Sequence, residues 1–332
     1  MDVYAAAAEN LPVRHHRLRR RIGFGEVMDM KKTLTTTLLA VSLLGLMALL
    51  LRHNQPVGQA VRQGLSLCGK SVIPSLFPFF VTVSLAVAWG LFDTLRRLGL
   101  PVGGAVFLLG IVGGYPVGGR TIGELYRAGT ISLRQAENLL TFCNNAGPSF
   151  ILSIAGAGVF GSQRAGWALY GIHVLAALAA GGLLGVFGEM AHGGHSGEKR
   201  CFFVPINAVN VPIKASTFVS VTRNAALSMV NVCAFVIYFL ALMALIRQLW
   251  PAVPMAALGL LELTSGITAL PDSPTGFCLA SALLGWGGVS VHCQTAAVLE
   301  DTGIFMGRYL LAKALQAVVS ALFALAACRF LF

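Results

Sequence analysis

Long apolar runs follow one another along nearly the whole sequence, and the polar segments between them are short. The first run, Thr33–Leu51, has the length that a helix needs to cross the hydrocarbon core of a bilayer, about 20 residues. Only 11% of the residues are charged, whereas a soluble domain carries about a quarter. The chain is therefore predicted to be an all-α polytopic membrane protein. Further runs lie at 72–92, 103–118, 139–160, 166–188, 218–246, 252–270, 275–299 and 308–331.

The net charge of +11 does not indicate nucleic-acid binding, because the basic residues form no single face. They gather near the N-terminus and in short segments between apolar runs, which is typical of a membrane protein that retains Lys and Arg in the cytoplasm. We expect the N-terminus and the loops at 96–97, 120–134 and 199–214 to be cytoplasmic. Residues 57–70 would then lie outside, and their basic residues favour an amphipathic surface helix instead.

The chain is predicted to divide into five parts. Residues 1–30 form a basic extension expected to be disordered, and translation is expected to start at Met28 or Met30. The next segment is a retained transmembrane anchor rather than a cleaved signal, because no small-x-small site follows Leu51. The remaining parts are a first repeat, a polar loop and a second repeat. The boundaries after the extension are 31–56, 57–190, 191–215 and 216–332.

Two halves of the sequence repeat the same order of elements. Gly147 and Gly166 in the first half have the same separation as Gly288 and Gly307 in the second. Each half is expected to contain one re-entrant hairpin or broken helix and about three transmembrane helices. An odd number of spans inserts the two copies upside down relative to each other. Inverted repeats with interrupted helices are a common architecture of secondary transporters.

The first half contains two interruptions rich in polar or flexible residues. Five glycines and Pro116 between Gly110 and Arg120 favour a hairpin tip over a lipid-facing helix, and Tyr115 lies within it. The other interruption is the stretch Asn144–Ser149, whose carboxamides are costly in hydrocarbon unless they find polar partners. Pro148 frees carbonyls one turn back, near Asn144 and Asn145. Close helix packing and helix–helix hydrogen bonding are the structural alternatives.

The second half contains matching candidates. Glu262 lies in a short apolar segment followed by Thr264 and Ser265, and a carboxylate at that depth is by default a functional hypothesis. The later stretch Gly285–Gln294 combines flexible backbone with polar groups. The predicted substrate-binding residues are Tyr115, Arg120, Asn144, Asn145, Ser149, Glu262, Thr264, Ser265, Ser290, His292 and Gln294. Either a surface position for Glu262 or a purely structural role for His292 stays open.

Nothing in the sequence indicates catalysis or a bound metal. His192 and His195 lie in a Gly-rich segment without a third ligand, and no two cysteines form a CxxC pair. The sequence contains no HExxH, GxSxG or P-loop motif. A hydrolase pairing Ser149 with His292 is conceivable, but no spacing supports it. We therefore expect no enzyme and no cofactor, with coupling to H⁺ or Na⁺ left open.

Several of these blocks resemble a known family. They are similar to the YlbJ (SpoVV) family of sporulation integral membrane proteins, which carries the nucleoside-recognition, or Gate, domain. The resemblance covers about residues 35–330, and Cys143 departs from it where a serine is expected. The matching blocks are Ile73–Phe80, Gly113–Gly118, Phe142 with Asn144–Pro148, and Ser281–Gln294.

The resemblance implies a multi-pass protein of the bacterial inner membrane that moves dipicolinic acid into the developing spore, with two Gate-like repeats. Arg120, Arg223 and Lys70 flank the interruptions and would suit such an anion, whereas Asn144, Asn145 and Glu262 would suit a nucleoside. The expected partners are a small-molecule substrate and the lipid bilayer, and the chain could form an oligomer. The alternatives are a nucleoside-like carrier and a non-transporting membrane scaffold or regulator of a sporulation or envelope complex.

Overall fold

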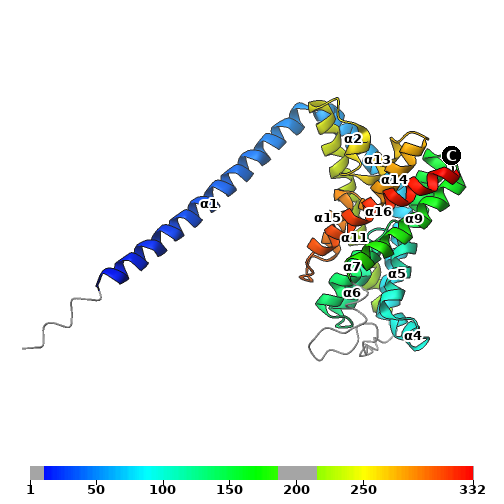
Figure 1. The fold of residues 1–332 in the computed structure, drawn as a ribbon, viewed down its shortest axis with the longest axis horizontal. Coiled ribbons are helices and arrows are strands. Elements are labelled where there is room, and N and C mark those ends of the chain that lie inside the picture. The colour runs from blue at the N-terminus through cyan, green and yellow to red at the C-terminus, as the bar shows by residue number, and fades with distance from the viewer. Residues whose placement is uncertain (1–10, 186–214, 332) are drawn as a thin grey trace, which may run out of the picture. The chain divides into compact units, whose positions relative to one another are not determined.

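The computed structural model describes residues 11–185 and 215–331, and these ranges contain helices and no strand. The residues group into two compact units, Met1–Gln55 and Pro56–Phe332 (Figure 1). Five helices among the described residues are long and apolar enough to cross a membrane. The chain is therefore a multi-pass membrane protein, as predicted. Residues 1–10 and the predicted polar loop with His192 and His195 lie outside the described residues.

The first unit contains helix α1 (Leu11–Arg52). Its segment Lys32–Arg52 is apolar enough to span a bilayer. Thr36 and Ser42 each donate a hydrogen bond to the carbonyl four residues back, so these hydroxyls are satisfied within the helix. The structure differs from the disordered extension predicted for 1–30, because the helix already begins at Leu11. Arg is frequent here, and Leu and Met also occur; all three are good helix formers.

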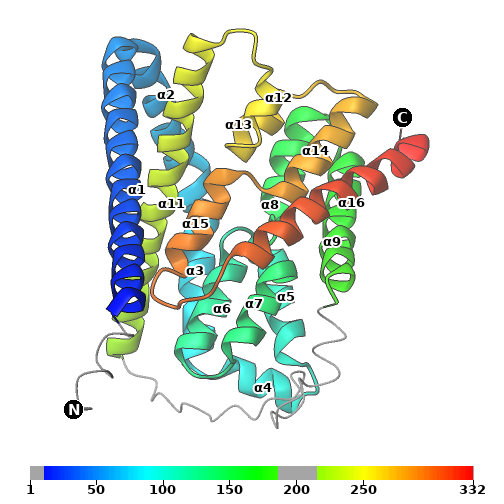
Figure 2. The same ribbon diagram turned by 60° about the vertical axis from the view of Figure 1, so that its left-hand side comes forward.

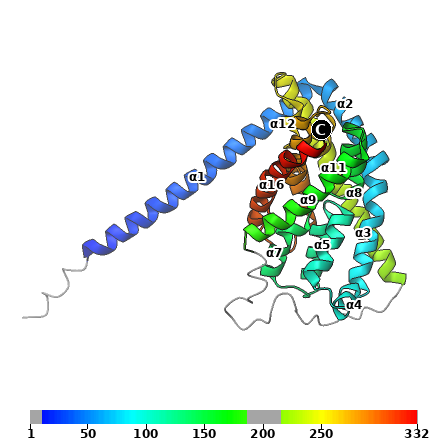
Figure 3. The same ribbon diagram turned by 45° about the vertical axis from the view of Figure 1, so that its right-hand side comes forward.

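The second unit contains all the other elements (Figure 2). Those before the undescribed segment are α2 (Asn54–Leu67), η1 (Cys68–Val72), α3 (Ile73–Ala88), α4 (Leu91–Arg97), α5 (Val102–Gly113), α6 (Val117–Arg127), α7 (Leu133–Cys143), α8 (Pro148–Phe150), η2 (Ile151–Val159) and α9 (Gln163–Leu183). Those after it are α11 (Ala215–Leu249), α12 (Met255–Leu258), α13 (Leu263–Thr268), α14 (Pro274–Trp286), α15 (Val289–Val298) and α16 (Gly307–Leu331). Helix α16 packs against both α9 and α14 (Figures 2 and 3).

Two helices are interrupted where the sequence predicted breaks. Helix α7 ends at Cys143, and the chain becomes helical again at Pro148. The carbonyl of Asn144 has no helical partner, because the residue four positions later is proline and lacks an N–H. Helix α14 ends at Trp286 and α15 begins at Val289, and the two glycines between them, Gly287 and Gly288, have positive φ.

The hairpin of α5 and α6 is longer than predicted. The sequence predicted a re-entrant element at 103–118 followed by a loop at 120–134, but the second arm continues as helix α6 to Arg127. Glycines allow α6 to approach its neighbours closely. A Cβ on Gly118 would meet the Cys143 carbonyl of α7, and one on Gly119 would meet Thr295 of α15. Arg120 is therefore on a buried helix and not in a loop.

Three apolar clusters form the interior of the second unit; the smallest contains Phe80, Val117 and Met229, and the other two are larger. The first, here the α5–α7 cluster, contains Val106, Ile122 and Leu140, together with Val298 and Tyr309 from the second half of the sequence. The second, here the α13–α14 cluster, contains Leu263, Phe277 and Leu284, together with Ile151, Leu169 and Ala324. Each of these two clusters therefore draws helices from both halves of the chain, and the first helix break lies between them, with Cys143 in one cluster and Ala146 in the other.

Candidate functional site

A cavity of about 320 Å³ lies where the first helix break, the two hairpin tips and α15 of the second unit meet. One wall is apolar and comes from α2, η1, α3 and α11, with Leu76, Phe79 and Val236 among its residues. Further lining residues come from the hairpin tip at Gly113–Tyr115 and from the first helix break at Ala146–Gly147. The cavity is therefore amphipathic, and its size is at the lower end of small-molecule sites.

Five of the predicted site residues line this cavity. They come from four separate elements of the fold, which the chain brings together only in three dimensions. Ser153, which the sequence did not single out, adds another hydroxyl. Glu262 and Tyr115 are the only titratable residues that line the cavity among the residues described. The five predicted residues are Tyr115, Ser149, Glu262, Thr264 and Gln294.

Glu262 is held in place by the first turn of α13. It is the N-cap of this helix: Oε1 accepts from the Thr264 N–H at 3.0 Å and Oε2 from the Ser265 N–H at 2.8 Å. A carboxylate is favourable at this end of a helix because the free N–H groups point toward it. Glu262 is only 3% exposed, so it is not at a wet surface. Ser265 contributes its backbone amide to this cap.

Ser290 and His292 lie on α15 but do not line the cavity. The Gln294 side-chain amide donates to the Ser290 hydroxyl at 3.2 Å, which fixes Gln294 in the cavity wall. His292 forms a 3.0 Å hydrogen bond between its Nδ1 and the Tyr309 hydroxyl. The edge of His292 also packs against Trp286, with ring centroids 4.5 Å apart.

Asn144 and Asn145 are completely buried behind the cavity wall. Asn144 joins three helices to its own: its Oδ1 accepts from the Gly119 N–H at 3.2 Å, and its Nδ2 donates to Thr295 at 2.9 Å and to Tyr309 at 3.2 Å. Asn145 donates to the Phe142 carbonyl at 2.6 Å. Their contacts are those of the helix–helix hydrogen-bonding alternative.

A buried lysine completes this polar layer. Lys313 of α16 has no exposed surface. Its ammonium donates to the Asn144 carbonyl, to Asn145 Oδ1 at 3.3 Å and to Gln316 Oε1 at 2.8 Å. The cation also lies 5.3 Å from the ring centroid of Tyr115, which lines the cavity. The freed carbonyl thus binds a cation, as the sequence allowed, but the cation belongs to the protein.

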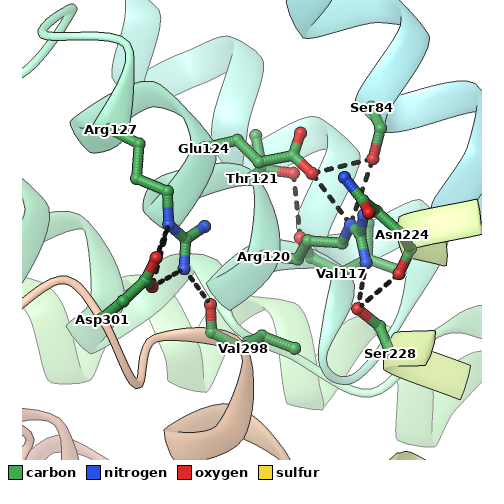
Figure 4. A network of polar contacts seen from close by, with 10 residues as sticks. All are labelled: Ser84, Val117, Arg120, Thr121, Glu124, Arg127, Asn224, Ser228, Val298 and Asp301. Carbon is green, nitrogen blue, oxygen red and sulfur yellow. Dashed lines mark hydrogen bonds and ion pairs between the residues drawn. The ribbon is translucent and has the colours of Figure 1, made fainter. Parts of the chain in front are cut away.

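Arg120 lies in a separate network at α6 (Figure 4). Its Nε donates to Glu124 at 2.9 Å and to Ser84 at 3.1 Å, and its Nη1 donates to Ser228 of α11. The guanidinium also stacks over Phe80, 5.3 Å from the ring centroid. Arg120 is 5% exposed and does not line the cavity. The predicted arginine therefore ties α3, α6 and α11 together.

Sequence reasoning missed Lys313, Gln316 and His173. Lys313 and Gln316 are three residues apart, so they share one face of an otherwise apolar helix. The sequence could have predicted that this pair is buried in the protein or faces water, because charged and amide side chains in a transmembrane helix do so. The Nε2 of His173 accepts a 3.0 Å hydrogen bond from the Ala146 N–H. No local sequence pattern predicts this contact.

Comparison with curated proteins finds a relative that aligns with most of the chain. The chain is 26% identical over 341 aligned positions to the "Sporulation integral membrane protein YlbJ" of Bacillus subtilis (strain 168). The alignment covers 89% of this chain and 83% of that protein. No protein-family model matches the chain, so the nucleoside-recognition domain stays a prediction. No solved structure matches it either.

Proposed function

Because the chain belongs to the family of the sporulation integral membrane protein YlbJ, we propose that it is a membrane carrier for a small polar solute. The observation that carries this proposal is the cavity at the meeting point of interrupted helices. Ser149, Glu262 and Gln294 are polar residues that line it among mostly apolar ones. Such groups are costly in hydrocarbon, so a protein retains them there for a solute or for water.

We further propose that the two halves are inverted repeats. The direction of matching helices relative to the two apolar clusters supports this. The first broken helix begins with α7 in the α5–α7 cluster and ends with η2 in the α13–α14 cluster. The second begins with α14 in the α13–α14 cluster and ends at Val298 in the α5–α7 cluster. Helices α9 and α16 also run in opposite directions between the clusters. Inverted repeats would provide alternating access by rocking around the central cavity.

The substrate that the resemblance implies is dipicolinic acid, a dianion at neutral pH. The three cations expected to bind it are not in the cavity wall: Arg120 is paired elsewhere, and Lys70 and Arg223 are exposed. The wall instead contains the Glu262 carboxylate, the Gln294 amide and several hydroxyls. This lining favours a second candidate, an uncharged solute with several hydrogen-bonding groups, such as a nucleoside.

Uptake by the purified full chain in proteoliposomes tests both candidates. Labelled dipicolinate and labelled uridine are offered separately, and saturable flux of either supports the carrier. The matched variants are Thr264→Val and Thr268→Val, which remove the same hydroxyl from one short helix. Only Thr264 lines the cavity, so only Thr264→Val should raise KM, by about tenfold if it loses one hydrogen bond to the solute.

The outcome also separates the carrier from a membrane scaffold. If the folded protein moves neither solute, the carrier proposal for these substrates is wrong, and the scaffold or regulator alternative gains. If solute flux is measurable and Thr264→Val and Thr268→Val have equal KM values, the cavity is not the binding site.

We propose a cytoplasmic N-terminus on the charge pattern alone, which a protease-protection assay in oriented vesicles tests.

A further inference from the structure

Lys313 is surrounded by oxygen atoms in the way that a bound metal cation would be. Its ammonium contacts one backbone carbonyl and two carboxamide oxygens, contributed by Asn144, Asn145 and Gln316. We call these three oxygens the cation site. Two ring faces, from Tyr115 and Tyr309, lie 5.3 and 5.8 Å from the ammonium and add attraction for a cation.

The backbone oxygen of this site exists because of the helix break. Asn144 is the C-cap of α7 and has extended rather than helical backbone angles. Its carbonyl lies at the end of the helix that carries partial negative charge. Unwound carbonyls and the C-terminal ends of half-helices are the groups that coordinate Na⁺ in transporters with interrupted helices. The first break therefore offers a soluble cation suitable ligands, and Lys313 already occupies them.

The site contains one charge and no anionic partner among the described residues. The ion pairs found in the described ranges join Arg120 to Glu124 and Arg127 to Asp301, and neither includes Lys313. The titratable side chains that face it are His173, His292 and Cys143, together with the two tyrosines above. His173 accepts the Ala146 N–H at Nε2, so it is neutral while this bond exists.

A purely structural position would not require a charge here. Removing an ammonium from water is costly, and neutral side chains of similar length pack a core at lower cost. The three oxygen atoms and the two ring faces together stabilise a positive charge at this position. The charge itself is therefore the property that this position provides.

We propose that the ammonium of Lys313 permanently fills a cation site at the first helix break, so that this protein needs no coupling Na⁺. The tethered cation stabilises the break in place of an exchangeable ion. The consequence for transport rests on the carrier function proposed above, whereas the occupancy of the site concerns the folded protein alone. The two are tested by separate measurements.

The first measurement is thermal unfolding of the purified full chain in detergent, with NaCl or choline chloride at equal ionic strength. The wild-type Tm should be the same in both salts, because the cation site is occupied. A higher Tm in NaCl would overturn the proposal. This arm needs neither a variant nor a substrate.

The second measurement uses Lys313→Ala, which removes the three methylenes and the ammonium beyond Cβ. Its Tm should fall by on the order of 5 °C or more, and n-propylammonium should restore part of that loss while choline does not. Lys70→Ala, at an exposed lysine, is the matched control and should respond to neither. Lys313→Met keeps the volume without the charge and should gain nothing from n-propylammonium.

Each result has a stated meaning. If Lys313→Ala folds but is as stable as the wild type, or gains equally from both organic cations, the ammonium does not fill a cation site and the proposal is wrong. If Lys313→Ala does not fold, Lys313→Met decides: a Tm equal to the wild type would overturn the proposal. If solute uptake is equal in Na⁺ and choline media, the conclusion that no Na⁺ is needed also holds for transport. If there is no uptake at all, the proposed carrier function is wrong, but the occupancy of the cation site by Lys313 is not affected.

Discussion

The two helix breaks have corresponding places in the order of elements, but different groups hold them. Side chains from several helices hold the first break: Asn144 reaches α6, α15 and α16, and Lys313 bonds to its carbonyl. Backbone groups hold the second break. The Val289 and Ser290 N–H groups donate to the Leu260 and Leu261 carbonyls at 2.9 and 2.8 Å.

This difference shows that one architecture can satisfy an interrupted helix in two ways. The first break gathers the Lys313 ammonium and carboxamide groups around the Asn144 carbonyl. The second break pairs its backbone with the α12–α13 segment, so it fixes the position of the hairpin that carries Glu262. A motion at the second break would therefore move a cavity wall, whereas a change at the first would alter the charge behind it.

The largest expected effect comes from alanine substitutions of the glycines that precede the two hairpin tips, Gly110 and Gly259. A Cβ on Gly110 would lie 1.8 Å from the Cys143 carbonyl oxygen, beside the first break, whereas one on Gly259 would approach the Gly266 Cα to 2.8 Å. Gly110→Ala should cost more than about 3 kcal/mol of unfolding free energy, and Gly259→Ala less. Thermal unfolding in detergent measures both, and an equal loss would show that the first break is no more tightly packed.

A smaller loss is expected when each break loses a side-chain hydrogen bond. Asn144→Ala removes the acceptor of the Gly119 N–H and the donor to Thr295 and Tyr309, which keep their bonds to Val291 and His292, and should cost about 2–3 kcal/mol. Trp286→Phe removes only the indole donor to the Leu260 carbonyl, at 3.0 Å, and should cost about 1 kcal/mol. The same unfolding assay compares them. If Trp286→Phe is the more damaging, side chains and not backbone hold the second break.

The backbone of the second break can be tested by Gly288→Ala. Gly288 has φ of 86° and ψ of 149°, a region that only glycine adopts without strain. Alanine should cost about 1–2 kcal/mol, and the loss of Tm should be accompanied by faster proteolysis of the α12–α13 segment. A variant with unchanged Tm would show that this break relaxes freely.

The smallest effect concerns the ion pair that joins α6 to the chain after α15. Arg127 bonds to Asp301 and to the Val298 carbonyl at 2.8 Å, and it holds the pKa of the Asp301 carboxyl below its usual range. A carboxyl with a lowered folded pKa stabilises the protein above its unfolded pKa, about 4, and this contribution is lost as the pH falls through the lower folded value.

Asp301→Asn should therefore lower stability by a few tenths of a kcal/mol at neutral pH, the range of an exposed pair, and by less as the pH approaches 3. Comparing the Tm of the variant and the wild type across this pH range measures the difference. A gap that grows toward acid pH would contradict the assignment to this carboxyl.

The sequence predicted the architecture better than the site. The apolar runs and Pro148 determine local backbone, so the multi-pass helical class and the break at Asn144 could be read from them. The place of Lys313 could not, because its partners come from helices far apart in the sequence. Arg120 was placed in a loop because its glycine neighbours suggested a turn, whereas those glycines allow α6 to pack against α7.

Glu262 serves the hairpin and the cavity with the same two oxygen atoms. Each accepts one N–H group of α13 and retains a second lone pair, so a solute that donates to this carboxylate shares it with the first turn of that helix. The group that a solute would contact is thus also the group that caps the helix. A substitution of Glu262 would therefore change the cavity lining and the hairpin end together.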